Sequence, residues 1–138
     1  MRCTSTRPGA YVLEPDPAVV RAQLVDELAC ALDAWRLDAE VAYLSTAALA
    51  LSPFARTFAV LAVHRYDPAA LRRALRQAGW RPVEIMKRRF PVPPEEVRRQ
   101  LGAWQAGEPV TLIMTRLEGR PTCIVCQEVS RSATLRSG

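Results

Sequence analysis

Apolar positions along the chain fall into two patterns, short continuous runs and longer segments with helical spacing. Short apolar runs bounded by proline, glycine or polar clusters predict strands. Six such runs occur, at 10–15, 41–44, 56–66, 81–89, 109–117 and 120–129. The segment 45–54 fits neither pattern, and Pro53 ends whatever element precedes it.

Three segments have apolar residues three or four positions apart and predict helices. The first, over 17–35, begins with Asp16 as its N-cap and Pro17 in the first turn. The second repeats this Asp-Pro start and ends at Gly79. The third lies within 91–104, after a run of prolines, and places Trp104 on its apolar face.

The predicted element order is βα(β)-βαβα-ββ, where the strand in parentheses is the one at 41–44. Strands that alternate with helices predict an α/β fold, here of the α+β kind, with a mixed sheet and helices packed on it. The last two strands are expected to form a β-hairpin. Its turn contains Gly119, which can take the positive φ that a tight turn requires.

The pattern predicts one folded domain over 10–129, with a possible subdivision into 10–52 and 53–129. The 138 residues suffice for a single domain with a substantial core. We expect residues 1–9 to form a flexible arm and residues 130–138 a disordered tail, because both segments are polar and lie at chain ends.

Composition narrows the class of protein. The chain is 49% hydrophobic and 24% charged, as in ordinary soluble proteins. It lacks both a membrane-spanning apolar stretch and the apolar core of a signal peptide. The four cysteines do not have the dense spacing of a secreted disulfide scaffold. These features predict a cytoplasmic protein with free thiols and no membrane partner.

The positive charge is concentrated in the middle of the chain. Residues 41–100 carry eleven Lys and Arg against four acids, whereas residues 1–40 carry four basic residues against seven acidic ones. A concentrated basic segment suggests an anionic partner such as nucleic acid. The alternative, a set of separate solvated basic faces, stays open at the level of sequence.

Five cations on two elements are the candidates for binding phosphate. Three lie side by side at the end of a predicted strand, and two lie four apart on one face of the preceding helix. The guanidinium group suits phosphate because its planar fork donates two parallel hydrogen bonds. The candidates are Lys87, Arg88, Arg89, Arg72 and Arg76. Arg73 on the same helix, and Arg98 and Arg99 on the next one, would extend this surface if the elements converge.

The sequence lacks the combinations of residues that catalytic sites and metal sites need. Cys123 and Cys126 form a C-x-x-C pair, but zinc normally requires two further ligands. In a strand these two side chains face opposite sides of the sheet, so we expect buried free thiols. His64 is the only histidine and has no nucleophile beside it. No glycine-rich loop follows a strand, so we expect no catalytic residue, metal ligand or cofactor in this chain.

Several stretches together resemble a known family, the THUMP-like C-terminal domain of bacterial class I S-adenosylmethionine-dependent methyltransferase-like proteins. The resemblance extends from residue 8 to residue 129. It combines an E-P-D-P-A-V motif with a later E-I-x-K-R motif. The stretches are "PGAYVLEPDPAVVRAQLVDELA" (8–29), "AYLS" (42–45), "PFARTFAVL" (53–61), "VEIMKRRF" (83–90) and "VTLIMTRLEGR" (110–120).

The resemblance implies a non-catalytic, RNA-binding accessory domain that presents a structured RNA, possibly a tRNA in a modification system, to a methyltransferase domain. The basic positions of the family correspond to Lys87 and Arg88 at the strand end and to Thr115 and Arg116 on the hairpin. Met86 stands where the family often has another basic residue. The patch is therefore expected to be weaker, or shifted towards Arg89.

The catalytic half of that family, which would bind S-adenosylmethionine, is absent from this sequence. The chain could be the C-terminal piece of a longer protein, a stand-alone remnant or a separately encoded partner, with the methyltransferase domain in cis or in trans. By itself it is not expected to be an enzyme.

Two other functions are open. The chain could be a protein-interaction or structural module that docks on a methyltransferase domain and stabilises it, with the acidic first helix as the docking face. An exposed apolar patch away from the arginines would favour this function. An independent small enzyme fits least well, because no catalytic constellation is present.

Overall fold

Residues 7–129, the part that the computed structural model describes, contain seven strands and four helices. The predicted tail at 130–138 and the first six residues of the predicted arm lie outside this part. The chain divides into two compact units, Met1–Val60 with Glu128–Gly138 and Leu61–Gln127. The elements are β1 (Tyr11–Pro15), α1 (Pro17–Arg21), α2 (Val25–Leu32), β2 (Trp35–Asp38), β3 (Val41–Thr46), β4 (Ala55–Arg65), α3 (Pro68–Ala78), β5 (Trp80–Lys87), α4 (Pro94–Leu101), β6 (Glu108–Leu117) and β7 (Arg120–Val129).

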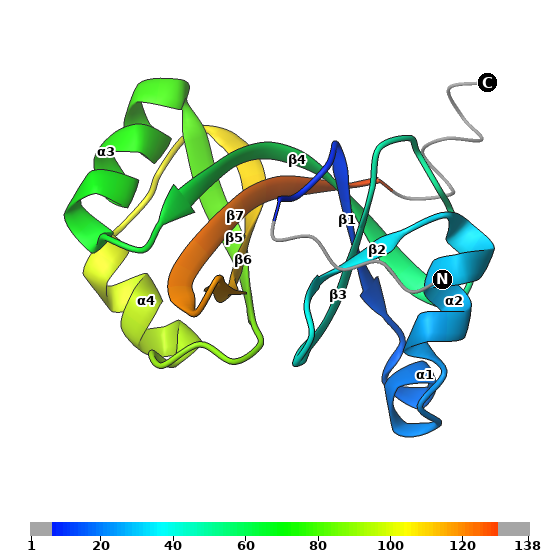
Figure 1. Cartoon of the computed structure of the whole chain (residues 1–138). Helices are drawn as coiled ribbons and strands as arrows, with labels where there is room; N and C mark the ends of the chain where they lie inside the picture. Colours follow the sequence, from blue (N-terminus) through cyan, green and yellow to red (C-terminus); the bar gives the residue numbers. More distant parts are fainter. Residues whose placement is uncertain (1–6, 130–138) are drawn as a thin grey trace, which may run out of the picture. The chain divides into compact units, whose positions relative to one another are not determined.

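The first unit contains α1, α2 and strands that lie side by side in the order β2-β3-β1-β4 (Figure 1). β1 pairs antiparallel with both β3 and β4. Leu13 of β1 and Leu44 of β3 are paired in register and are both fully buried. They pack with Val25 and Ala29 of α2, so a helix covers this part of the sheet.

The prediction of a single helix over 17–35 is wrong. α1 ends after five residues, and Gln23 takes a positive φ of 61° between the two helices. α2 ends at Asp33, which has a φ of 55° in the left-handed region. Trp35 then begins β2, a strand that the sequence pattern did not predict. Trp35 has the spacing of a helical residue but forms a strand, because pairing with β3 provides hydrogen-bond partners for the backbone N–H and C=O groups of β2.

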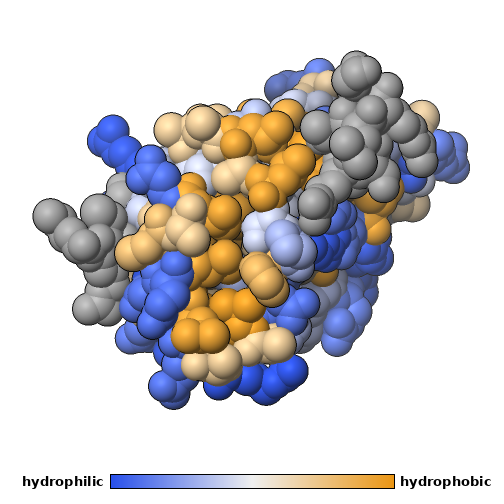
Figure 2. Space-filling model, turned by 90° about the vertical axis from the view of Figure 1, so that its right-hand side faces the viewer, coloured by the Kyte–Doolittle hydropathy of each residue, from blue (hydrophilic) through white to orange (hydrophobic). Residues whose placement is uncertain are grey.

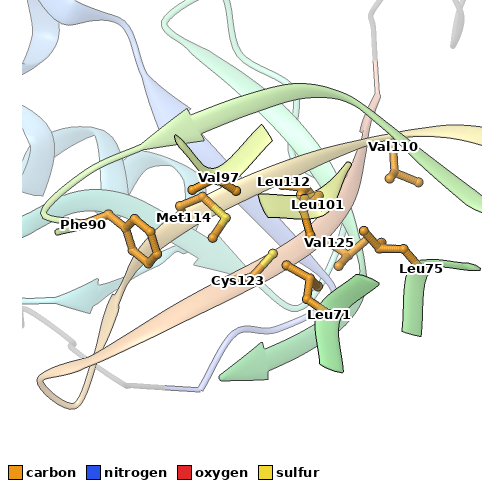
Figure 3. Packing of buried hydrophobic residues seen from close by; sticks show 10 residues of the cluster. All are labelled: Leu71, Leu75, Phe90, Val97, Leu101, Val110, Leu112, Met114, Cys123 and Val125. Atoms are coloured by element: carbon orange, nitrogen blue, oxygen red, sulfur yellow. The ribbon is translucent and has the colours of Figure 1, made fainter. Parts of the chain in front are cut away.

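In the second unit, α3 and α4 cover one face of strands in the order β7-β6-β5 (Figure 1). β5 and β6 pair in parallel, with α4 in the connection between them, and β6 and β7 form an antiparallel hairpin. Figure 3 shows the buried cluster that joins helices to strands. Its members are Leu71, Leu75, Phe90, Val97, Leu101, Val110, Leu112, Met114, Cys123 and Val125.

Local signals explain why α3 forms where the sequence predicts it. The Asp67 side chain accepts a hydrogen bond from the backbone N–H of Ala70 at 3.2 Å, which caps the first turn. Gly79 ends the helix with a φ of 75°. Leu71 and Leu75, one turn apart, are buried against the sheet. Burying each leucine contributes about 1.5–3 kcal/mol, which holds the helix on its strands.

One boundary near the candidate residues differs from prediction. α4 lies within 91–104 and after the prolines, as expected, with Pro93 as its N-cap and Gly102, with a φ of 80°, at its end. β5 ends at Lys87, so Arg88 and Arg89 follow the strand instead of forming its last residues. Trp104 therefore lies in the segment after α4, and it packs against the core cluster that contains Val97 and Leu101.

The C-terminal hairpin is confirmed as predicted. Glu118 and Gly119 form its turn with φ values of 55° and 72°, as a tight two-residue turn requires. Cys123 and Cys126 are both buried free thiols, as expected. Burial raises the pKa of Cys123 to about 12, which disfavours its reactive thiolate form.

The α+β class with a mixed sheet is confirmed, since β5 and β6 run parallel while β1–β3, β1–β4, β2–β3 and β6–β7 are antiparallel pairs. Within residues 7–129, none of the four helices has the length and apolarity that crossing a bilayer demands.

One arginine of the basic segment is used inside the first unit. Arg56 donates two hydrogen bonds to the carboxylate of Glu128, at 2.8 and 3.1 Å. Its guanidinium also lies 5.0 Å from the ring centroid of Phe58. The hydrogen bond and the positive charge hold the pKa of Glu128 below its usual value. Arg56 is thus a structural cation and a poor candidate for binding phosphate.

Candidate nucleic-acid interface

Four of the six predicted residues lie at the neighbouring ends of β5 and β6. The parallel register pairs Lys87 with Met114, and the backbone N–H of Arg88 donates to the Met114 carbonyl at 3.0 Å. Arg116 lies two residues further along β6, at the same end of the sheet. All four side chains are exposed. We call Lys87, Arg88, Arg89 and Arg116 the strand-end cluster.

A buried aromatic residue anchors this turn of the chain. Arg89 has a φ of 56°, which redirects the backbone after β5. The next residue, Phe90, is only 5% exposed and belongs to the core of the second unit. Its ring and that of Tyr66 form a T-shaped pair, with centroids 4.9 Å apart and an interplanar angle of 86°. The three consecutive cations are therefore attached to a packed base.

Arg72 and Arg76, the other two predicted residues, lie on the exposed side of α3. Arg72 and Arg73 line a hollow of about 510 Å³ together with Gln100 of α4. Arg76 lines a second hollow, beside the segment that follows α4. The structure thus distributes the six residues over two groups, the strand-end cluster and the outer side of α3.

Not every nearby arginine is available to a ligand. Arg99 of α4 donates a hydrogen bond to the carboxylate of Glu96, one turn earlier in the helix. This bond, together with the positive charge, holds the pKa of Glu96 below its usual value. Arg98 makes a long hydrogen bond of 3.5 Å to the carbonyl of Val83. Arg98 and Arg99 therefore both have partners within the second unit.

Sequence reasoning missed an aromatic pocket beside Arg76. The guanidinium carbon of Arg76 lies 4.4 Å from the ring centroid of Trp104, within the range of a cation–π contact. One guanidinium N–H also donates to the carbonyl of Ala103 at 3.3 Å. The cavity measures about 490 Å³. Its lining residues are Arg76, Gly79, Trp80, Ala103, Trp104, Gln105 and Ala106.

A signal for this pocket was present in the sequence. Gly102 is a helix-ending residue, and it separates Trp104 from the apolar positions of α4. If the helix ends at Gly102, Trp104 belongs to the segment that follows the helix. The packing of that segment on α3 decides which arginine Trp104 contacts, and the spacing of residues in the sequence does not reveal this contact.

Two observations on residues 7–129 concern metal and nucleotide-cofactor binding. Among residues 7–129, no group of three or more His, Cys, Asp and Glu side chains lies close enough together to hold a metal ion. The connection from β5 to α4 contains prolines and cations but no glycine. It therefore lacks the glycine-rich turn that brings a backbone close to a nucleotide cofactor such as S-adenosylmethionine.

Comparison with known proteins shows which proteins the chain is similar to. The profile of the family described as THUMP domain-like matches residues 55–128. Two curated proteins of Mycobacterium tuberculosis, from strains CDC 1551 / Oshkosh and ATCC 25618 / H37Rv, are each 34% identical over 109 residues. Both are called uncharacterized S-adenosylmethionine-dependent methyltransferases. These matches cover 79% of this chain but only 30% of each relative, so the chain spans less than a third of their length.

A solved structure shares the fold. The crystal structure of a proposed methyltransferase from Porphyromonas gingivalis W83 matches with a TM-score of 0.78 and 22% sequence identity. The match covers 94% of this chain and 32% of the other chain. At this level of identity the similarity establishes the fold alone.

Proposed function

The chain belongs to the THUMP domain-like family, and on that premise we propose that it is a non-catalytic RNA-binding accessory domain of a methyltransferase system. The sequence resemblance to this family is confirmed by the match over residues 55–128. The proposed ligand is a structured RNA, with tRNA as one candidate. S-adenosylmethionine would be bound by a separate catalytic domain, in cis or in trans, in the cytoplasm.

The strand-end cluster is the observation that carries this proposal. Lys87 and Arg116 lie at the neighbouring ends of two adjacent parallel strands, and Arg88 and Arg89 directly follow the first of them. The pairing of β5 with β6 holds these backbone segments together. Cations grouped on a rigid base bind phosphates with little loss of backbone entropy on binding. Arginine adds the planar fork that donates two hydrogen bonds to one phosphate.

The absence of a base-reading motif is compatible with this role. Folded RNA is recognised largely through its shape, its phosphates and its 2′-hydroxyl groups. An accessory domain that positions an RNA needs affinity and orientation, and a catalytic domain can supply the choice of nucleotide.

The proposed methyltransferase context comes from the relatives. The proteins of M. tuberculosis are named methyltransferases and are more than three times as long as the region they share with this chain. The shared region has no glycine-rich turn between β5 and α4. We therefore assign cofactor binding and methyl transfer to the part of such proteins that this chain does not contain.

The salt dependence of RNA binding tests the proposal. A structured RNA such as a tRNA should bind this chain, and its affinity should fall steeply between low and moderate salt as counterion release is lost. Four phosphate contacts would give a slope of about −3 in a plot of log affinity against log salt. The measurement is a filter-binding or gel-shift titration at several salt concentrations. Absence of binding at low salt, or affinity that does not vary with salt, would contradict the proposal.

A second candidate function is docking on the methyltransferase domain, and one surface feature favours it. Val20, Leu24 and Phe54 are large apolar residues of the first unit, and Phe54 is 56% exposed. The backbone N–H of Asp16 donates to the Phe54 carbonyl at 2.8 Å, so Phe54 lies beside the start of α1. Figure 2, turned to the side where α1 and α2 lie, shows hydrophobic surface spreading across that face.

If this apolar face docks on the catalytic domain, backbone amides of α1 should exchange more slowly with solvent when that domain is linked or added. Replacing both Leu24 and Phe54 with serine should remove the protection, because the buried apolar area is lost. The matched control is Val83→Ser, which changes a residue 45% exposed on β5. Hydrogen exchange that is unchanged by the catalytic domain would exclude this docking face.

A further inference from the structure

We propose that the pocket between the end of α3 and the segment after α4 binds a single unpaired nucleobase. This inference deepens the proposed RNA-binding function and rests on it. We call the pocket, with its lining residues Arg76, Gly79, Trp80, Ala103, Trp104, Gln105 and Ala106, the tryptophan pocket. Its volume of about 490 Å³ lies in the range of small-molecule sites.

The lining chemistry favours a flat aromatic ligand in an anionic molecule. Trp80 and Trp104 supply aromatic surface, and the guanidinium of Arg76 lies over the Trp104 ring at 4.4 Å. Unstacked bases in RNA complexes stack on aromatic rings and on arginine planes, and every base offers such a face. A cation beside the rings also attracts the phosphate that accompanies each base.

The walls of the tryptophan pocket are built into the fold. The backbone N–H of Glu108 donates to the Gly79 carbonyl at 2.8 Å, which ties the start of β6 to the end of α3. Gly107 has a φ of 128°, and a Cβ atom there would lie 3.0 Å from the same carbonyl. This close approach requires glycine and limits movement of the segment. A preformed pocket loses little entropy when a ligand binds.

The adjacent arginines of α3 provide a path for the RNA backbone. Arg72 lies one helical turn before Arg76 and lines the neighbouring hollow with Arg73 and Gln100. Residues one turn apart on a helix lie on the same face. A base in the tryptophan pocket would therefore place its flanking phosphate near cations that the sequence analysis had already selected.

A mononucleotide titration tests the pocket without a folded RNA. Adenosine monophosphate should perturb the indole N–H signals of Trp80 and Trp104, but not that of Trp35 in the first unit. Trp104→Leu should weaken binding by about tenfold, the effect of losing one stacking partner. Ala106→Leu, at an exposed lining position, should have a similar effect by filling the pocket while leaving the core intact. The matched control Trp35→Phe should bind normally.

A second titration separates this inference from the RNA-binding proposal. An RNA stem with a single-stranded overhang should bind more tightly than the blunt stem, and Trp104→Leu and Ala106→Leu should abolish the difference. Equal binding of the two RNAs by the unaltered protein, with no change in the Trp80 and Trp104 signals, would overturn the pocket and leave the RNA-binding proposal intact. Absence of RNA binding would overturn the RNA-binding proposal. It would also overturn the RNA role of the pocket, even if the mononucleotide binds there.

Discussion

Replacing Lys87, Arg88 and Arg89 with glutamine is expected to weaken binding of a structured RNA by on the order of 100-fold at about 0.1 M salt. Each phosphate contact contributes to affinity through the counterions it releases, and three contacts are lost together. The slope of log affinity against log salt should become shallower by about two to three. Glutamine keeps an unbranched side chain, so the turn at Arg89 is preserved as far as possible.

A charge-matched variant distinguishes a site from a general charge effect. Arg21, Arg65 and Arg98 are exposed residues of α1, β4 and α4, and replacing all three with glutamine changes the net charge equally. This control should retain most of the affinity and the salt slope. If both triple variants lose the same affinity, the RNA does not recognise the strand-end cluster and the assignment of these residues is wrong. Circular dichroism should show that both variants are folded.

Leu112→Ala is expected to destabilise the second unit by about 2–5 kcal/mol. Leu112 lies on β6 and is fully buried in the cluster that joins both helices to the strands (Figure 3). The substitution removes apolar contacts and leaves a cavity, because close-packed neighbours relax only partly into the space. Urea unfolding followed by circular dichroism measures the change in the free energy of unfolding.

The matched control for this prediction is Leu49→Ala. Leu49 is 45% exposed in the segment between β3 and β4, so the same deletion of side-chain atoms should cost well under 1 kcal/mol. Similar losses for the two variants would mean that Leu112 is not part of a close-packed core. If unfolding occurs in two steps, only the step that belongs to the second unit should respond to Leu112→Ala.

Neighbouring residues along the chain were sufficient to predict α3 and the β6–β7 hairpin. Asp67 and Gly79 cap the two ends of α3, and the glycine of the hairpin turn takes the required positive φ. These signals depend on backbone conformation within a few residues, so they can be recognised without knowledge of the fold. The burial of both thiols was also expected from sequence, because free cysteine is among the residues most often buried.

Long-range pairing explains where the sequence pattern failed. The apolar spacing of residues 17–35 is helical throughout, yet Gln23 and Asp33 take left-handed conformations that end α1 and α2. Trp35 joins a strand because β3 is available to pair with it. Propensity is a weak prior that tertiary contacts override, and no residue near Trp35 in the sequence reveals its partner.

The sequence by itself determined the family, through the resemblance of its motifs, and the α+β class with most strand positions, through local signals. It also supplied the basic residues proposed to bind phosphate. Only the tertiary structure decided which of those residues are neighbours. The register of β5 with β6 brings Arg116 to the end where Lys87 lies, and the packing of the segment after α4 brings Trp104 to Arg76. Such neighbours are far apart along the chain, and their proximity arises from strand pairing and core packing, which no local pattern encodes.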